Sequence, residues 1–369
     1  MILQGLELRR VQLPLIAPFQ TSFGTQTVRD IVLVRAITDA GEGWGECVTM
    51  PWPLYSSEST DLVIPLISAH LAPRLFAAPQ LRAEDVRPLL GPIHGHPMAK
   101  AALEAAILDA ELTAEGRSFA AYLGVSRDRV PCGVSVGIFP SIPELLAAVE
   151  AYLDQGYQRI KLKIQPGWDI EPVRAVRQTF GADVPLQVDA NAAYAPTDIT
   201  PLQALDPFDL LLIEQPFPEE FLLANADLRT AITTPLCLDE SATSTAVVAD
   251  AIRADAVDII NIKPGRVGGF LEAVEMHDLC RARGVPVWCG GMVESGIGRA
   301  ANTALAALDG FTLVGDNSAF DRFFATDIVT DPRVMVDGHL RVPTRPGMGF
   351  ELDVDAVRAA TVETVTVAA

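Results

Sequence analysis

The chain has 369 residues, of which 49% are hydrophobic, and its 28 basic and 47 acidic residues give a formal net charge of −19. This charge disfavours nucleic acid or an anionic membrane as a partner. No apolar stretch reaches the length that spans a bilayer, and the start of the chain alternates instead of forming a signal-peptide core. The five cysteines form no CxxC motif, so we expect buried, reduced thiols and a cytoplasmic protein.

The first third of the chain predicts an α+β domain. Residues 1–50 contain alternating runs separated by polar turns, which is typical of an antiparallel meander. Residues 58–78, 83–91 and 97–115 have helical spacing, and the last of these segments is rich in Ala, Leu and Glu. We therefore assign residues 1–125 to one domain.

After Pro131 the sequence alternates between apolar strands and helices. Several apolar runs are continuous, as in parallel strands that are buried on both faces. Eight such strands favour a closed TIM barrel over residues 126–320, and no glycine-rich nucleotide motif follows any of them. Residues 321–369 hold short strand-like pieces that we expect to pack back on the first domain. The predicted strands cover residues 132–137, 158–164, 185–189, 209–214, 235–239, 257–263, 285–289 and 311–315.

Five chemically active residues recur at nearly constant intervals within the predicted barrel. Lys163, Asp189, Glu214, Asp239 and Lys263 are separated by 26, 25, 25 and 24 residues, and each ends a short apolar run. A strand, a helix and their connecting loops take about that many residues. Because the carboxyl ends of parallel strands meet at the mouth of a barrel, the spacing predicts one shared site.

The three carboxylates predict a divalent metal. Asp189, Glu214 and Asp239 would end neighbouring strands, and Mg²⁺ (or Mn²⁺) prefers such hard oxygen ligands. Without an ion, three converging anions would repel one another. The alternative is that each acid merely caps the helix that follows it.

The lysines predict two bases on opposite sides of this metal. Lys161 and Lys163 are two residues apart, so both face the barrel interior, and Lys263 ends the strand on the opposite side of an eight-stranded barrel. A lysine with its ordinary pKa of about 10.4 is a poor base at neutral pH. Burial, the metal and a neighbouring cation would lower that pKa, with Lys161 acting on Lys163 and Arg266 on Lys263. The alternative is that these are solvated surface lysines.

A metal between two bases suits removal of a proton α to the carboxylate of a small-molecule substrate. The ion would stabilise the enediolate while one lysine takes the proton. Two opposed bases permit racemisation, and they also permit β-elimination with one lysine as the base. An alternative is that the chain is a non-catalytic barrel that binds a metal and a dicarboxylate.

The motifs around these residues resemble those of the enolase superfamily, muconate-lactonising subgroup, along the whole chain. Further segments are similar to the family of N-acylamino acid racemases and o-succinylbenzoate synthases, notably PFQTSFGT, GWGECVTM, CGVSVG and WCGGMVESGIGR. The superfamily motifs read KLK (161–163), VDAN (188–191), IEQP (213–216), LDES (238–241) and NIKPGRVGG (261–269).

The resemblance implies a (β/α)7β TIM barrel, an N-terminal capping domain and a homo-oligomer. Lys163 and Lys263 would be the acid/base pair, and the three carboxylates would hold Mg²⁺ or Mn²⁺. The loops that contain Phe19 and Met50 would close over the barrel mouth. Supporting roles fall to Lys161, Asn191 and Arg266, and the substrate pocket would be lined by Phe19, Met50, Ser135, Gly291, Val293 and Phe323.

Two differences from other branches of the superfamily narrow the range of expected substrates. Trp288-Cys289-Gly290 at the seventh strand lacks the histidine base of mandelate racemases, and Asp316-Asn317-Ser318 at the eighth lacks the DxD of dipeptide epimerases. An acylated nitrogen is therefore favoured over a free ammonium group. Muconate cycloisomerisation and dipeptide epimerisation stay open as alternatives. The sequence also leaves open whether racemisation or a synthase step in menaquinone biosynthesis is the physiological role.

Overall fold

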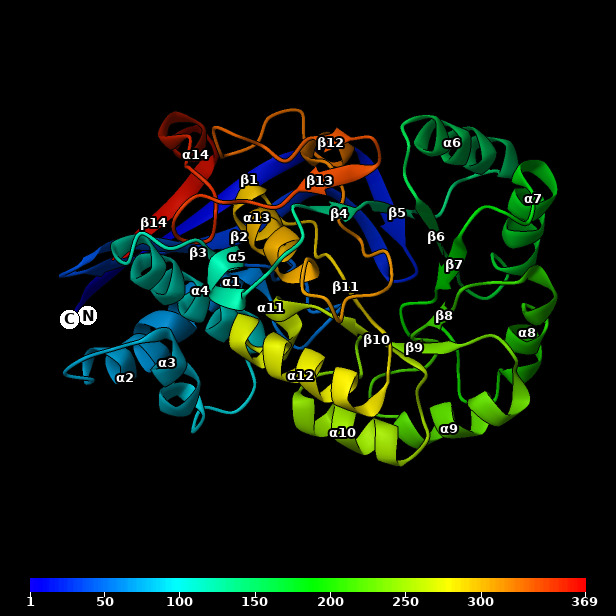
Figure 1. Cartoon of the computed structure of the whole chain (residues 1–369), viewed down its shortest axis with the longest axis horizontal. Coiled ribbons are helices and arrows are strands. Elements are labelled where there is room, and N and C mark those ends of the chain that lie inside the picture. Colours follow the sequence, from blue (N-terminus) through cyan, green and yellow to red (C-terminus); the bar gives the residue numbers. More distant parts are fainter.

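The computed structural model describes residues 1–369 as two parts that lie side by side, an antiparallel sheet with helices and a curved parallel sheet ringed by helices (Figure 1). Both termini lie at the far edge of the antiparallel sheet. A cluster of 79 buried hydrophobic residues has members in both parts, so the two share one core. None of the helices combines the length and the apolar content of a membrane span.

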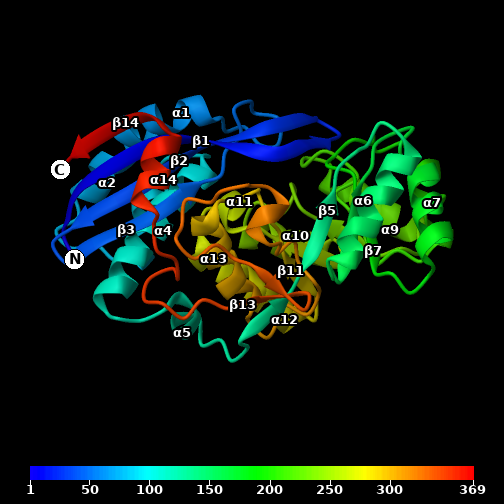
Figure 2. The same ribbon diagram turned by 90° about the horizontal axis from the view of Figure 1, so that it is seen from above.

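The antiparallel sheet confirms the predicted meander. Its order is β14-β1-β2-β3, with β1 (Leu3–Thr21), β2 (Gly24–Thr38), β3 (Gly41–Cys47) and β14 (Thr361–Ala368). The long β1–β2 ribbon reaches from this sheet towards the parallel sheet (Figure 2). The antiparallel part thereby extends to the parallel sheet.

The helices of this part lie where their spacing predicts them, except α5, which was not predicted. A continuous helical run consists of α1 (Thr60–Leu66), the π-helical turn η1 (Ile67–Leu71) and α2 (Ala72–Phe76), and it is followed by α3 (Ala83–Leu90), α4 (Pro97–Ala114) and α5 (Phe119–Leu123). Helix α4 packs directly on β3 because Gly43 and Gly45 have no side chains. A Cβ atom at Gly45 would lie 2.0 Å from the carbonyl oxygen of Ala102. Any larger residue would push the helix off the sheet.

The parallel sheet contains seven of the eight predicted strands. Its order is β11-β10-β9-β8-β7-β6-β5, and successive strands are joined by helices on the outer face (Figure 1). The strands are β5 (Gly133–Val136), β6 (Arg159–Lys163), β7 (Leu186–Asp189), β8 (Ile213–Glu214), β9 (Leu236–Leu238), β10 (Ile259–Ile262) and β11 (Val287–Cys289). The helices are α6 (Ile142–Asp154), α7 (Ile170–Phe180), α8 (Ile199–Gln203), η2 (Asp206–Phe208), α9 (Leu222–Ala231), α10 (Thr245–Arg253), α11 (Pro264–Val267), α12 (Phe270–Arg283) and α13 (Gly296–Ala306).

The eighth predicted strand, residues 311–315, is wrong as a strand but lies where it was expected. The backbone N–H of Leu313 donates to Val287 (3.4 Å) on one side, and Gly315 accepts from Gly133 (3.1 Å) on the other. An isolated bridge joins Phe311 to Val287. With so few bonds the segment lacks the repeating ladder of a strand, yet it links β11 to β5 and completes the ring.

The C-terminal residues contact both parts. The short strands β12 (Met335–Val336) and β13 (His339–Arg341) form a small sheet with β4 (Arg129–Pro131), whereas β14 pairs with β1. The turn η3 (Phe320–Arg322) and the helix α14 (Val354–Ala360) were not anticipated from the sequence, which suggested strand-like pieces only.

Candidate active site

The five periodic residues meet at the carboxyl ends of neighbouring strands. Lys163 ends β6, Asp189 ends β7 and Glu214 ends β8, and these three residues are direct partners across the sheet. Asp239 follows β9 and Lys263 follows β10. All five side chains are buried, so the reading as surface lysines is wrong.

The three carboxylates form a compact cluster of oxygens. One oxygen from each of Asp189, Glu214 and Asp239 lies within 4.8 Å of the other two. Burial, and next the charge of Asp189, raises the pKa of Glu214 well above its usual value. A buried group of anions at this spacing fits a divalent cation, which would relieve their repulsion.

The two lysines bind opposite ends of the carboxylate row. The Lys163 ammonium donates to Asp189 and to Asn191, each at 2.6 Å. The Lys263 ammonium donates to Asp239, also at 2.6 Å. Since β6 and β10 flank β7–β9 in the sheet, the lysines stand on either side of the triad.

Without a bound ion, neighbouring acids oppose the predicted fall in the pKa of Lys263. Burial disfavours its charged form, but Asp239 and other neighbouring acids outweigh burial and raise the pKa well above its usual value. The same balance raises the pKa of Lys161, whose nearest carboxylates are Asp316 (2.6 Å), Glu214 (3.0 Å) and Asp189 (3.2 Å). The prediction was based on burial, a metal ion and the neighbouring cations, and these carboxylates act against it.

Of the supporting residues, Arg266 contacts a metal-ligand candidate and Asn191 contacts a base. Arg266 donates to Asp239 and, at 3.0 Å, to the carbonyl oxygen of Ala242, and it makes no hydrogen bond to Lys263. Asn191 accepts from Lys163 and donates to Glu240 at 3.0 Å. Each thus fixes the direction of a charged group at the triad.

Three residues that hydrogen-bond to the lysines and carboxylates of the site were not predicted from the sequence. The Tyr55 hydroxyl donates to Asp239 (2.8 Å) and accepts from Lys263 (3.2 Å). Asn261 donates to Glu214 at 2.7 Å, and Asp316 accepts from Lys161. Asn261 could have been found, because it lies two residues before Lys263 on the same strand face. Tyr55 has no comparable signal.

A cavity of about 60 Å³ opens beside the lysines. The Phe19 and Phe323 rings meet edge to face there, with centroids 5.6 Å apart. Met50 does not line this cavity. Its side chain belongs to the hydrophobic core, and its backbone forms an isolated bridge with Ser59. The walls consist of Phe19, Ser135, Lys161, Lys163, Lys263, Gly291, Val293, Glu294, Arg299, Asp316, Ser318 and Phe323.

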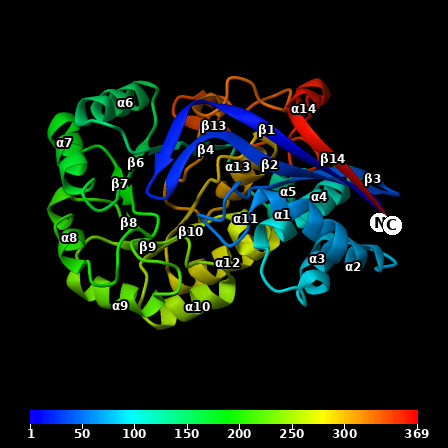
Figure 3. The same cartoon turned by 180° about the vertical axis from the view of Figure 1, so that it is seen from behind.

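The capping part reaches the site through two loops. Between β1 and β2, the Ser22 hydroxyl donates to the carbonyl oxygens of Ala190 (3.2 Å) and Asn191 (3.3 Å), directly after β7. Viewed from behind, the tip of this ribbon lies over the strands of the parallel sheet (Figure 3). The second loop carries Tyr55. Both loops therefore cover the carboxyl ends of the strands.

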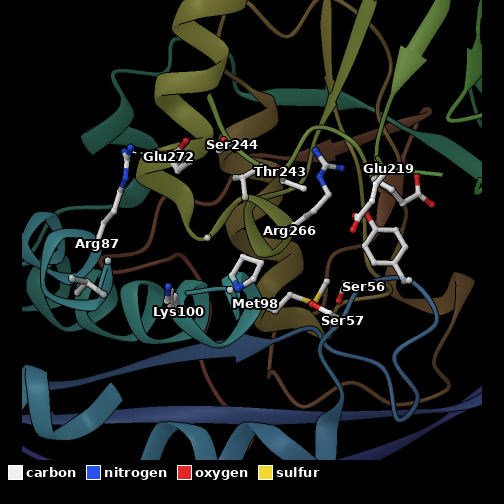
Figure 4. Close-up of a pocket in the computed structure, with 18 residues that line it drawn as sticks. Ser56, Ser57, Arg87, Met98, Lys100, Glu219, Thr243, Ser244, Arg266 and Glu272 are labelled. Atoms are coloured by element: carbon white, nitrogen blue, oxygen red, sulfur yellow. Dashed lines mark ion pairs between the residues drawn. The ribbon is translucent and has the colours of Figure 1, made fainter. Parts of the chain in front are cut away.

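A larger cavity, of about 420 Å³, lies between helix α4 and the loops after β9 and β10 (Figure 4). Ser57 and Lys100 come from the capping side, and Thr243 and Arg266 from the barrel side. None of Lys161, Lys163 and Lys263 lines it. The smaller cavity is the candidate reaction site, because Lys161, Lys163 and Lys263 all line it together with Phe19 and Phe323.

The fold and the site define a barrel enzyme of the enolase type, with an acidic triad between two lysines. Residues 5–124 match the family described as mandelate racemase/muconate lactonizing enzyme, N-terminal domain, and residues 144–357 match enolase C-terminal domain-like. The chain belongs to the enolase superfamily and, within it, to the family of N-succinylamino acid racemases and o-succinylbenzoate synthases.

Similar proteins carry both of these activity names. The chain is 63% identical to N-succinylamino acid racemase from Amycolatopsis sp. (95% of each chain). It is 44% identical to o-succinylbenzoate synthase from Geobacillus kaustophilus (94% of this chain, 92% of that one). The crystal structure of an enolase superfamily member from Listeria innocua matches with a TM-score of 0.95 at 40% identity, covering 100% of this chain and 99% of that one.

Proposed function

We propose that the protein removes the α-proton of a carboxylate substrate and racemises N-acylamino acids, above all N-succinylamino acids. Dehydration to o-succinylbenzoate is a second reaction of the same site. The observation that carries the proposal is the pair of buried lysines at opposite ends of the carboxylate triad. The activity names of the relatives at 63% and 44% identity support the choice of substrates.

In this proposal Asp189, Glu214 and Asp239 hold Mg²⁺ or Mn²⁺. The ion would supply positive charge that attracts the substrate carboxylate, stabilises the enediolate and offsets the carboxylates that raise the pKa of Lys263. The hard oxygen donors and their spacing suit either ion.

Lys163 and Lys263 do the proton transfers. One neutral Nζ takes the proton from one face of the α-carbon, and the other Nζ, protonated, delivers a proton to the opposite face. The reverse reaction exchanges their roles. For dehydration one lysine, which we propose to be Lys163, takes the α-proton and returns it to the departing hydroxyl group, which leaves as water, and the other lysine contributes charge alone. Asn191 orients Lys163 through their hydrogen bond of 2.6 Å.

The two capping loops exclude water from the reacting carbon. Phe19 lies in β1 beside the first loop, Tyr55 lies in the second loop, and both side chains are buried. We propose that the loops open for substrate, since a cavity of about 60 Å³ is smaller than an acylated amino acid.

Dipeptide epimerisation is disfavoured by the position of Asp316. This carboxylate already accepts from Arg159 (2.8 Å) and Lys161 (2.6 Å), so it is not free to bind the ammonium group of a dipeptide.

The test is incubation of the metal-loaded enzyme with N-succinyl-L- and N-succinyl-D-amino acids in D₂O. We expect loss of the α-proton signal and formation of the opposite enantiomer from both substrates. Formation of o-succinylbenzoate, followed by absorbance, tests the second reaction. Absence of α-proton exchange with any acylated amino acid would contradict the proposal.

We further propose a cytoplasmic homo-oligomer. The family resemblance supports the assembly, and the five buried, unpaired cysteines support a reducing compartment. Light scattering at micromolar concentration tests the assembly, and a monomer mass would refute it.

A further inference from the structure

Two arginines at the wall of the substrate cavity have no carboxylate partner, and of these Arg299 is buried and Arg322 is half-buried. The Arg299 guanidinium donates to the carbonyl oxygens of Ser318 (2.6 Å) and Glu294 (2.9 Å). The Arg322 guanidinium donates to the carbonyl oxygen of Ser135 (2.9 Å). No carboxylate oxygen lies within 4.0 Å of either group. Both are therefore cations held by neutral oxygens.

Arg322 stands directly behind the aromatic wall of the cavity. Its guanidinium carbon lies 4.5 Å from the centre of the Phe323 ring, 5.6 Å from that of Phe19 and 4.9 Å from that of Tyr152. Phe19 and Phe323 line the cavity, together with Ser135 and Arg299. Because aromatic rings screen charge far less than water does, the field of Arg322 reaches the cavity.

Three polar atoms around this wall lack a hydrogen-bond partner. They are the Ser135 hydroxyl and the Nε atoms of Arg299 and Arg322. Burial lowers the pKa of Arg322 from its usual value, yet a guanidinium stays charged at neutral pH. Buried charges are almost always paired, so the unpaired buried cation of Arg299 costs stability unless an anion approaches. None of the 47 acidic residues of the chain supplies that anion.

We propose that Arg322, together with Arg299, makes this wall electropositive and selects acyl groups that end in a carboxylate, such as succinyl, over neutral acyl groups of the same length. This inference rests on the proposed function, and it assigns the preference for the acyl group to these two arginines. Arg322 acts through the rings of Phe19 and Phe323, so it determines specificity and takes no part in proton transfer.

The test compares two substrates that differ only in terminal charge, an N-succinylamino acid and its N-succinamoyl analogue, in which an amide replaces the distal carboxylate. The wild-type ratio of kcat/KM should favour the carboxylate at least tenfold. Arg322→Met should lower this ratio about tenfold, the effect of one poorly screened charge several ångströms away. Arg322→Lys should retain most of it.

Arg174→Met is the matched control. Arg174 also stacks on a ring, that of Phe208 (5.8 Å), but it lies on the outer helix α7 and pairs with Glu171. This variant should keep the wild-type ratio. An equal loss on both substrates in Arg322→Met would overturn the inference, because it would assign Arg322 a purely structural role.

A measurement on the wild-type enzyme alone covers the case in which Arg322→Met does not fold. N-succinylglycine has no stereocentre and should inhibit competitively, at least tenfold more tightly than its terminal amide. Equal inhibition by the two compounds would overturn the inference. If Arg322→Met racemises both substrates with the wild-type ratio of kcat/KM, the inference is wrong but the proposed function stands. If the wild-type enzyme racemises neither substrate, the proposed function is wrong.

Discussion

Replacing Asp316 by Asn should destabilise the protein and reduce its activity. The Asp316 carboxylate is shared by two buried cations, Arg159 at 2.8 Å and Lys161 at 2.6 Å. Removal of one partner from a buried ion pair typically costs about 3–5 kcal/mol, and the amide oxygen that remains as an acceptor favours the lower end, about 3 kcal/mol. With an unfolding entropy of roughly 2.1 cal/mol/K per residue, 369 residues convert this loss into a fall in Tm of about 4 °C.

Differential scanning calorimetry at pH 7 measures this change. The pKa of Asp316 lies below its usual value because Lys161 and Arg159 outweigh the effect of burial. The ion pairs therefore contribute stability above pH 4, and that contribution is lost as the pH falls through the lowered pKa, so the variant should approach wild type only in acid. Activity should fall about 10–100-fold, because Lys161 loses one of its anchors. The exposed Asp321→Asn is the control, and equal Tm values for Asp316→Asn and wild type at pH 7 would refute the reasoning.

Three further predictions concern the metal, the buried acids and the acyl pocket. Glu214→Gln removes one anionic ligand, so Mg²⁺ affinity measured by calorimetric titration should fall at least tenfold while the circular dichroism spectrum is retained; unchanged affinity would exclude Glu214 as a ligand. Burial raises the pKa of Glu58 to about 7, so the free energy of unfolding of the wild type should fall by about 3 kcal/mol between pH 4.5 and 7 through this group. In denaturant titrations Glu58→Gln should not show this fall, and the same pH dependence in both proteins would contradict the prediction. Phe19→Ala should change relative kcat/KM across N-acyl chains with little effect on metal affinity, and an unchanged preference would reject Phe19 as a pocket wall.

The sequence was enough to predict most of the fold and the centre of the site. Each of the five periodic residues follows an apolar run, and the βα period brings the ends of such runs together, so spacing alone placed Lys163 and Lys263 around the triad. The strand at 311–315 could not be judged in the same way, because its sequence favours a strand while its neighbours offer too few hydrogen bonds.

The contacts across the site depend on residues far apart in the chain. Tyr55 and Asp239 are 184 positions apart, and Lys161 and Asp316 are 155 apart, so no local pattern links them. The direction of the pKa shift of Lys263 depends on a distance of 2.6 Å to Asp239, which spacing does not provide. Met50 was assigned to the pocket through the family resemblance, whereas packing places it in the core.

The two-base geometry is tested most directly by α-proton exchange in Lys163→Ala and Lys263→Ala. Each variant is incubated in D₂O with Mg²⁺ and the separate enantiomers of an N-succinylamino acid, and exchange is followed by proton NMR. Because the lysines stand on opposite sides of the triad, each variant should lose exchange with one enantiomer, a different one in each case, and both should lose racemisation. Racemisation at the wild-type rate in either variant would contradict the mechanism.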